Sequence, residues 1–321
     1  MAGIFRPDPE ECYSLVADGP RRPGNTGRGA TLVDEVIDFH AHIFPPEVVR
    51  RREAVFDRDR YFAWLYGRRS ARLATAEDLA AALDGAGIRA AVAMNFGWSD
   101  PELCRRTNDY LLDAARRFPG RIYPCVMVPF GEPDLAVAEL ERAARAGAVG
   151  LGEVMPDGQG LDLDHPESLG PILSAAVRLG LFVVVHASEP VGHRYPGKGT
   201  VWPHRLERLY GSFPDVRFVF AHLGGGLPFY GLMPEVKAAL RKVWFDTAAL
   251  PFLYEPEAVR IAAGIVGPER LLFGTDFPLI NYGRMFDYLG RVGLSPADNS
   301  PAARQFFGAN ARELLGFGGR G

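Results

Sequence analysis

The sequence predicts an α/β fold, a distorted (β/α)8 TIM barrel with an irregular N-terminal extension. Short apolar runs rich in Val, Ile and Phe alternate with amphipathic stretches rich in Ala, Leu, Arg and Glu, which is the pattern of repeated βα units. The runs are continuously apolar, as in parallel strands covered on both faces. Eight strands are expected, at Val36–His40, Ala90–Asn95, Ile122–Val128, Val149–Glu153, Phe182–His186, Arg217–Ala221, Val243–Asp246 and Arg270–Thr275.

Helices are expected between these strands. Several begin with a Thr, Ser or Asp cap or with Pro in the first turn. The main alternative is an open doubly wound sheet, but its nucleotide-binding form needs G-x-G-x-x-G after the first strand, and the sequence has no such motif there. The expected helical ranges are Thr75–Ala86, Glu102–Phe118, Asp134–Ala146, Glu167–Leu179, Pro203–Phe213 and Pro256–Ala263.

The 321-residue chain is expected to consist of an extended leader, residues 1–33, and a single barrel domain, residues 34–321. The segment Asp18–Ala30 is rich in Pro, Gly and Arg and shows no periodicity, which is typical of an irregular arm. Barrels of this class commonly reach this length as one domain, so the length does not require a second domain.

Composition excludes several classes of protein. Hydrophobic residues make up 47% and charged residues 23% of the chain, as in ordinary globular proteins. The net charge is −3, and Lys and Arg are scattered, so we expect no nucleic-acid partner. The longest apolar run, Leu179–Ala187, is much shorter than the roughly 20 residues of a membrane helix, so we expect no membrane association.

The cysteines and the N-terminus predict a cytoplasmic protein. Cys12, Cys104 and Cys125 are odd in number and form no C-x-x-C pair, which favours a reducing compartment. The first residues lack the pattern of a secretory signal. The apolar helical faces and the leader permit a homodimer without requiring one.

Acids and imidazoles follow the apolar runs at the predicted strand ends. Catalytic groups of TIM barrels lie at the carboxyl ends of the strands, whatever the reaction. A single His in such a place is more often a packed core or rim residue, but the joint pattern favours a chemical site. The residues are His40, His42, Glu153, His186, His222, Asp246 and Asp276.

The first pair, in "VIDFHAHIFPP", suits metal binding. On a strand, residues i and i+2 point to the same side, so His40 and His42 can bind one ion together. His186 and Asp276 could complete the site. Such ligands suit Zn²⁺ best and are acceptable to Mn²⁺, Fe²⁺ or Co²⁺.

The order H-x-H, His, His followed by glycines, and then "FGTDFP" resembles the amidohydrolase superfamily. Within it, the resemblance is to the branch of aminocarboxymuconate semialdehyde decarboxylase-like and "amidohydrolase 2" proteins. The segment Phe306–Gly316, "FFGANARELLG", is similar to the ending of that branch. The resemblance runs from about Val36 to the C-terminus and implies a metal-dependent TIM barrel.

The resemblance implies a role for each strand-end residue. Asp276 would also take the proton of a metal-bound water, and His222 would act as acid or base. Glu153 would bridge two ions where two are bound, so one ion or two remain open. The implied metal ligands are His40, His42, Glu153, His186 and Asp276.

The main functional prediction is hydrolysis of an amide, lactone or ester-like bond in a small, acidic organic substrate. A bound metal lowers the pKa of its water toward about 7 and so supplies the nucleophile. The alternative is metal-dependent decarboxylation of a small carboxylic acid at the same site. A further alternative is a non-catalytic ligand-binding barrel.

Substrate-binding residues are expected in the loop after the fifth strand and at one aromatic position. Residues 188–203 form a long loop with Gly and Pro in which Arg194, Tyr195 and Lys198 could clamp an anion. Trp98 could form an apolar wall. The structural alternatives are a solvated loop and a packing role for the tryptophan.

Overall fold

The computed structural model describes residues 35–316, and the expected leader lies outside these residues. Its centre is one eight-stranded sheet in which each strand is parallel to the next one along the chain. All eight predicted strands are confirmed. They are β1 (Ile37–His42), β2 (Ala90–Met94), β3 (Ile122–Val126), β4 (Gly150–Val154), β5 (Phe182–Val185), β6 (Phe218–Phe220), β7 (Val243–Asp246) and β8 (Leu271–Leu272).

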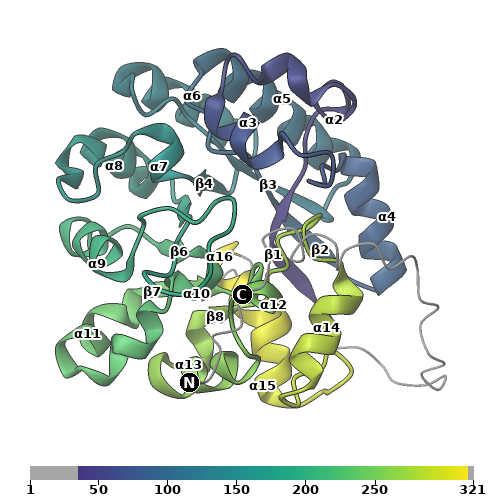
Figure 1. Ribbon diagram of the computed structural model, residues 1–321, viewed down its shortest axis with the longest axis vertical. Helices are drawn as coiled ribbons and strands as arrows, with labels where there is room; N and C mark the ends of the chain where they lie inside the picture. The colour runs from purple at the N-terminus through teal and green to yellow at the C-terminus, as the bar shows by residue number, and fades with distance from the viewer. Residues whose placement is uncertain (1–34, 317–321) are drawn as a thin grey trace, which may run out of the picture.

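Helices form a ring around these strands (Figure 1). The longer helices match the predicted ranges, with one addition after β8. They are α4 (Ala76–Ala86), α5 (Pro101–Arg117), α6 (Pro133–Arg145), α8 (Gly170–Arg178), α9 (Pro203–Ser212), α13 (Glu257–Val266) and α14 (Tyr282–Gly290). Short helices occupy the connections: α2 (Pro46–Arg50), α3 (Arg60–Tyr66), α7 (Pro156–Gln159), α10 (Ala221–Gly224), α11 (Pro234–Ala239), α12 (Leu250–Leu253), α15 (Pro301–Arg304) and α16 (Asn310–Leu314). Within residues 35–316, no helix is long and apolar enough to cross a bilayer.

Local sequence signals fix several helix boundaries. Thr75 and Asp78 form a capping box at the start of α4, and Gly87 ends this helix with a left-handed φ of 68°. The Asp100 carboxylate accepts the backbone N–H of Leu103, and Pro101 occupies the first turn of α5. These caps explain why the helices were predictable from the sequence to within a few residues.

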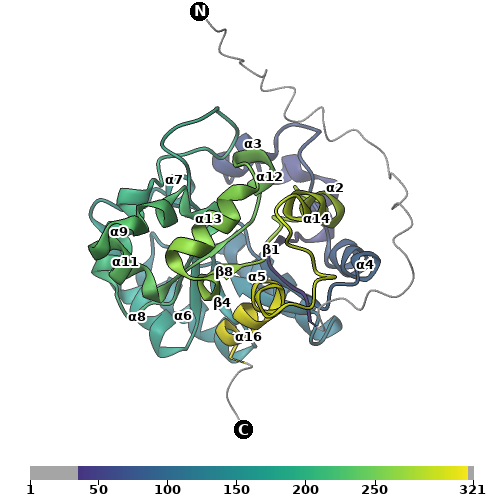
Figure 2. The same ribbon diagram turned by 90° about the horizontal axis from the view of Figure 1, so that it is seen from below.

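The last helix closes one end of the barrel. Ala311 and Leu314 of α16 pack with the residues of the barrel interior. The side-chain amide of Asn310 donates to the carbonyls of Pro268 and Leu271, which lie at the start of β8. Figure 2 shows α16 on the opposite side of the molecule from α3 and α12. The carboxyl ends of the strands therefore remain as the free end of the barrel.

The first and last strands meet in a seam that closes the sheet. The ladder part of β8 is shorter than predicted, and the residues after it pair with β1, where an isolated bridge joins Ala41 and Phe277. The seam is made of three backbone hydrogen bonds: Phe39 N to Phe273 O at 2.7 Å, Asp276 N to His40 O at 2.8 Å and His42 N to Phe277 O at 2.7 Å.

A buried carboxylate reinforces the seam. Asp38 is fully buried in β1 and accepts hydrogen bonds from the backbone N–H of Thr275 at 3.0 Å and from its hydroxyl at 2.5 Å. It also accepts the backbone N–H of His40 at 3.0 Å. Burial raises the pKa of Asp38 to about 6, although the hydrogen bonds from Thr275 and His40 oppose the change.

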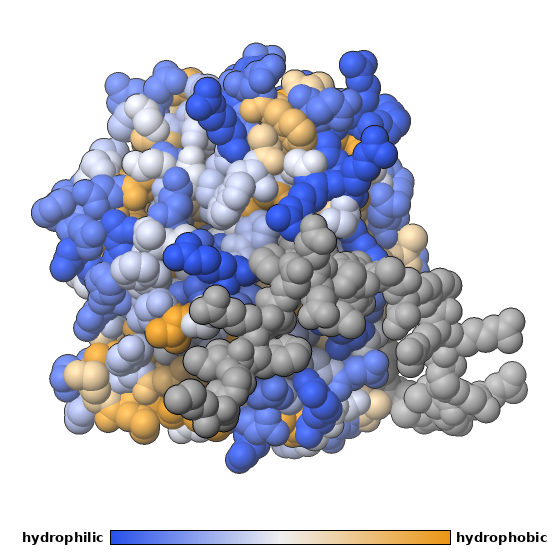
Figure 3. Space-filling view, viewed as in Figure 1, coloured by the Kyte–Doolittle hydropathy of each residue, from blue (hydrophilic) through white to orange (hydrophobic). Residues whose placement is uncertain are grey.

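Apolar residues are exposed over one part of the surface. Figure 3 shows them gathered at the lower left, in the region of α11 and α13. They include Leu232, Met233 and Ile261, and Leu232 is 78% exposed. The homodimer that the sequence permits remains untested by these residues.

Asp38→Asn should change how stability depends on pH. An acid whose pKa is raised by folding stabilises the fold while protonated, and this contribution is lost as pH rises through its folded pKa. The pKa of Asp38 rises from 3.8 to about 6, so the free energy of unfolding of the wild type, minus that of Asp38→Asn, should fall by about 2 kcal/mol between pH 4 and pH 6. Urea unfolding of the two chelator-treated proteins at each pH measures this difference in the free energy of unfolding. A difference that does not vary with pH would contradict the raised pKa.

Candidate metal centre

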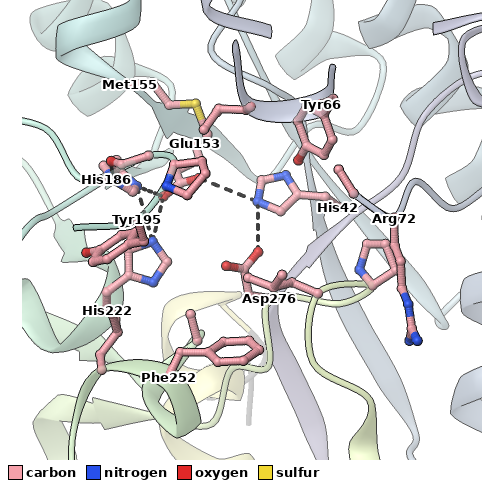
Figure 4. A pocket seen from close by; sticks show the side chains of 18 of the residues that line it. His42, Tyr66, Arg72, Glu153, Met155, His186, Tyr195, His222, Phe252 and Asp276 are labelled. Carbon is pink, nitrogen blue, oxygen red and sulfur yellow. Dashed lines mark hydrogen bonds and ion pairs between the residues drawn. The ribbon is translucent and has the colours of Figure 1, made fainter. Parts of the chain in front are cut away.

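The polar strand ends predicted from the sequence converge at the free end of the barrel. His40 and His42 belong to β1 and Glu153 to β4. The others end their strands or follow within four residues, namely His186 after β5, His222 after β6, Asp246 at the end of β7 and Asp276 after β8. Figure 4 shows five of these side chains, His42, Glu153, His186, His222 and Asp276, pointing toward one another at the bottom of a pocket.

His40, His42 and Asp276 form one group of donor atoms. The Nε2 atoms of the two histidines lie 3.1 Å apart. Asp276 Oδ1 lies 3.6 Å from His42 Nε2 and 4.0 Å from His40 Nε2. Both imidazoles are buried, while the Asp276 side chain is 16% exposed and lines the pocket. The i, i+2 spacing on the strand therefore places both rings on one side, as predicted.

Glu153, His186 and His222 form a second group. Glu153 Oε1 lies 3.0 Å from His186 Nδ1 and 3.4 Å from His222 Nε2, and the two nitrogens are 3.1 Å apart. The other oxygen, Glu153 Oε2, faces the first group at 3.4 Å from His42 Nε2. Glu153 therefore presents one oxygen atom to each group.

Hydrogen bonds on the outer side of three imidazoles determine which nitrogen faces inward. Carboxylate and carbonyl oxygens only accept, so the ring nitrogen that contacts them carries the hydrogen. In a neutral ring the other nitrogen then keeps its lone pair. The outer bonds are His40 Nδ1 to Asp246 Oδ2 at 2.8 Å, His186 Nε2 to Gly197 O at 3.0 Å and His222 Nδ1 to Ala248 O at 3.0 Å.

The donor atoms fit a divalent metal. Ligands at about 2.1 Å from a tetrahedral ion are about 3.4 Å from one another. Within the two groups the distances between donor atoms run from 3.0 to 4.0 Å. In neutral rings the lone pairs of His186 Nδ1 and His222 Nε2 would face each other at 3.1 Å, an arrangement that requires a proton or a cation between them. Imidazole and carboxylate ligands suit zinc, manganese, iron and cobalt ions.

The buried carboxylates of the centre also favour bound protons or metal cations. Burial alone would lower the pKa of His40, but the carboxylates of Asp246 and Glu153 raise it to about 9. Burial would likewise lower the pKa of His222, but its hydrogen bond to Glu153 raises it to about 10. Burial would raise the pKa of Glu153, yet the charge of His186 holds it well below its usual range. Without metal, the centre therefore retains protons.

Two residues of the centre have left-handed backbones. The φ angles are 55° at His222 and 66° at Asp276, values that residues other than Gly rarely adopt. Glycines follow His222, and a Cβ at Gly225 would lie 2.2 Å from the carbonyl oxygen of Ser188. The "HLGGG" sequence thus lets the β6 loop approach the β5 loop closely.

A pocket of about 160 Å³ opens above the donor atoms. A cavity of about 150 Å³ is enough to bind benzene, so the pocket has room for one ring. Arg72 and His193 also line it. Most of the wall is apolar or aromatic, including Leu65, Tyr66, Met155, Tyr195, Phe252 and Leu279.

The residues predicted to bind substrate lie in different places. Tyr195 lines the pocket. Arg194 is exposed and is not among the lining residues, and the Lys198 ammonium donates to backbone carbonyls of its own loop. Trp98 is fully buried, with its indole N–H donated to Asn95, and is also absent from the lining.

Sequence reasoning missed several residues of the pocket wall. Tyr66, Arg72 and Phe252 lie in the irregular connections after β1 and β7, where no periodicity marks them. The available signal was their position after a strand, because βα connections build the mouth of such barrels.

Comparison with known proteins agrees with this geometry. The family model described as Amidohydrolase matches residues 37–317. The chain is 23% identical over 270 residues to 2-amino-3-carboxymuconate-6-semialdehyde decarboxylase of Dictyostelium discoideum, covering 71% of this chain and 72% of that protein. It is 25% identical over 258 residues to gamma-resorcylate decarboxylase of Rhizobium radiobacter, covering 68% and 77%.

Solved structures share the fold. A 5-carboxyvanillate decarboxylase from Novosphingobium aromaticivorans, complexed with manganese and 4-hydroxy-3-methoxy-5-nitrobenzoic acid, superposes with a TM-score of 0.71 at 19% identity. The similarity covers 91% of this chain and 98% of that one. It supports the barrel predicted from the sequence.

Metal binding should release protons. A metal needs the lone pairs of neutral imidazoles, whereas metal-free His40 and His222 have pKa values of about 9 and about 10 and hold protons at pH 7.5. Apparent affinity for Mn²⁺ or Zn²⁺ should therefore rise about tenfold per pH unit for each proton displaced, up to about pH 9. Calorimetric titration in two buffers of different protonation enthalpy counts these protons. His204→Ala, at an exposed position of α9, should leave the count unchanged. Binding without proton release would contradict the raised pKa values.

Proposed function

The chain belongs to the amidohydrolase family, whose model matches residues 37–317, and on this basis we propose that it is a metal-dependent decarboxylase of a small aromatic or unsaturated carboxylic acid. The observation that carries the proposal is the arrangement at the bottom of the pocket. Metal donors, an acid and an imidazole face a cavity with room for one ring.

Decarboxylation is favoured over hydrolysis, which was the main prediction from the sequence. The relatives named above are decarboxylases, and two of them act on or bind aromatic acids by name. The pocket wall is mostly apolar, which suits a reaction that converts a charged carboxylate into neutral CO₂. Hydrolysis would use the same donor atoms, but the relatives do not specifically support it.

His40, His42 and Asp276 would hold a divalent metal, with Glu153 beside them. When bound, the metal would supply a Lewis acid for oxygen atoms of the substrate. Zinc was the first expectation from the sequence, and manganese is present in the similar structure, so both are candidates. Because Glu153 presents an oxygen to each donor group, His186 and His222 give room for a second ion.

The acid and base groups of this chain complete the reaction. The bond between the ring and its carboxylate breaks, CO₂ leaves, and the electron pair remains on the ring carbon. That carbon takes a proton from His222 or Asp276, both of which line the pocket. In the metal-free protein the hydrogen bond to Glu153 raises the pKa of His222 to about 10, so His222 would be the proton donor when no second ion occupies its group, and solvent would restore the proton after each turnover.

Arg72 would attract the acidic substrate. It carries the guanidinium of the pocket wall and lies on the far side of the pocket from Glu153 and His186 (Figure 4). A charged group there raises the local concentration of anions and would meet an anionic or hydroxyl group remote from the reacting carboxylate. Tyr195 covers the side next to the histidines.

The protein loaded with Mn²⁺ or Zn²⁺ should release CO₂ from hydroxylated benzoic acids such as 2,6-dihydroxybenzoate. A chelator should abolish the activity, and added metal should restore it. Asp276→Asn and His222→Asn should each lower kcat by about 10²-fold to 10⁴-fold, because each removes a proton-transfer group. Gas release and product formation are measured, with esters, lactones and amides tested in parallel. Turnover of those compounds without CO₂ release from any acid would sink the decarboxylase proposal.

Arg72→Ala should raise KM for acidic substrates by about tenfold or more, because a charged hydrogen bond contributes about 1.5–3 kcal/mol. Arg194→Ala removes the same charge from an exposed position outside the wall and serves as the matched control. Steady-state kinetics at two salt concentrations separates the two variants. Equal effects of both substitutions would show that only long-range charge matters.

A further inference from the structure

Asp246 contacts the centre without lining the pocket. It ends β7, is fully buried, and its two oxygens have different partners. Oδ2 accepts from His40 Nδ1 at 2.8 Å. Oδ1 accepts the backbone N–H groups of His222 and Ala248, each at 3.0 Å. One carboxylate therefore joins a residue of each donor group.

We propose that Asp246 is a positioning residue that fixes the His40 imidazole with Nε2 toward the metal and holds the backbone of His222 beside the same centre. The part that concerns the metal rests on the proposed function. The orientation of the two side chains does not, because it is a property of the metal-free protein.

The two histidines of β1 differ in how they are held. The ring of His40 donates Nδ1–H to a carboxylate, which leaves Nε2 as the inward lone pair of the neutral ring. Among residues 35–316, His42 Nδ1 is buried without a hydrogen-bond partner. An outer hydrogen bond therefore sets the tautomer of the neutral His40 ring, whereas none sets that of His42. Of the two histidines, His40 is the one whose ring is oriented by a hydrogen bond to Asp246 in the metal-free protein.

His222 is held from two directions. Its backbone N–H donates to Asp246 Oδ1, and its ring Nδ1 donates to the carbonyl of Ala248. The backbone N–H of Ala248 is bound to the same Asp246 oxygen. These bonds hold the left-handed backbone of His222, so its Nε2 faces Glu153 and His186.

The substitution Asp246→Asn tests how the His40 ring is oriented, because the new side-chain amide has only one favourable orientation. Two backbone N–H groups point at one position, so the amide oxygen must occupy it. The amide NH₂ then faces His40 Nδ1, which must accept instead of donate. In the neutral ring the hydrogen moves to Nε2, where it blocks the ligand atom.

Loss of charge alone could also weaken binding of a cation, and Asp38 provides the control for this. Asp38 is likewise a fully buried aspartate, and it lies two residues before His40. Its bonds go to Thr275 and to the backbone of His40 rather than to an imidazole nitrogen. Asp38→Asn removes the same charge without turning a ring, and it keeps the seam, because the amide oxygen can accept both backbone N–H groups and the NH₂ can donate to the Thr275 hydroxyl.

The first experiment measures the affinity of metal-free wild type, Asp246→Asn and Asp38→Asn for Mn²⁺ at pH 7.5. We expect a loss of about 10-fold to 100-fold for Asp246→Asn, the usual effect of removing a partner of a ligating His, and a change within about threefold for Asp38→Asn. Circular dichroism and thermal unfolding check the folds. Wild-type affinity in Asp246→Asn, or equal losses in both variants, would overturn the proposal.

The second experiment needs no metal and no activity. Long-range ¹H–¹⁵N correlation of histidine-labelled, chelator-treated protein, at an alkaline pH at which the same spectrum shows the His40 ring to be neutral, should show hydrogen on Nδ1 in the wild type and on Nε2 in Asp246→Asn. Hydrogen on Nδ1 in both would overturn the proposal. If the wild type binds no metal but Asp246→Asn still moves the hydrogen of His40 from Nδ1 to Nε2, the proposed function is refuted and the inference stands. If Asp246→Asn does not fold, Asp246→Ser, whose hydroxyl is too short to hold the ring, should show mixed tautomers.

Discussion

The seam between β1 and β8 is the constraint on which the rest of the structure depends. Asp38 and Thr275 are 237 residues apart in the chain, and their hydrogen bonds hold the first strand against the last. The bonds of Asp38 add to the three backbone hydrogen bonds that join the residues after β8 to β1. Without this seam, His40 and His42 would not meet Asp276, and the barrel would have polar strand ends but no common centre.

The centre places charged groups where an apolar barrel would normally exclude them. Asp246 and Glu153 are almost wholly buried, and each is bonded to imidazoles that burial would otherwise keep neutral. Protons or cations must neutralise this excess of negative charge. The same requirement that makes the metal-free centre retain protons makes it a good receptor for a divalent ion, so proton binding and metal binding compete for the same nitrogen atoms.

The periodic parts of the fold were predictable, and the irregular parts were not. The eight strands and their polar ends follow from continuous apolar runs that stop at an acid or an imidazole. Arg72 and Phe252 could not be found, because nothing in an irregular connection indicates which side chain turns inward. Trp98 was expected at the pocket wall but is fully buried, since burial of an aromatic residue depends on its neighbours. The reaction was ambiguous because hydrolysis and decarboxylation need the same donors.

Among residues 35–316, the helix α16 packs its apolar residues against the amino-terminal end of the strands and so covers the end of the barrel opposite the pocket. The pocket at the other end is lined by residues of the connections after β1, β5, β7 and β8. In the proposed reaction, the entering acid and the departing CO₂ would both use the mouth of this pocket. A bulky group attached near α16 would lie away from the pocket mouth. That end of the barrel is therefore suited to tethering the protein to a surface.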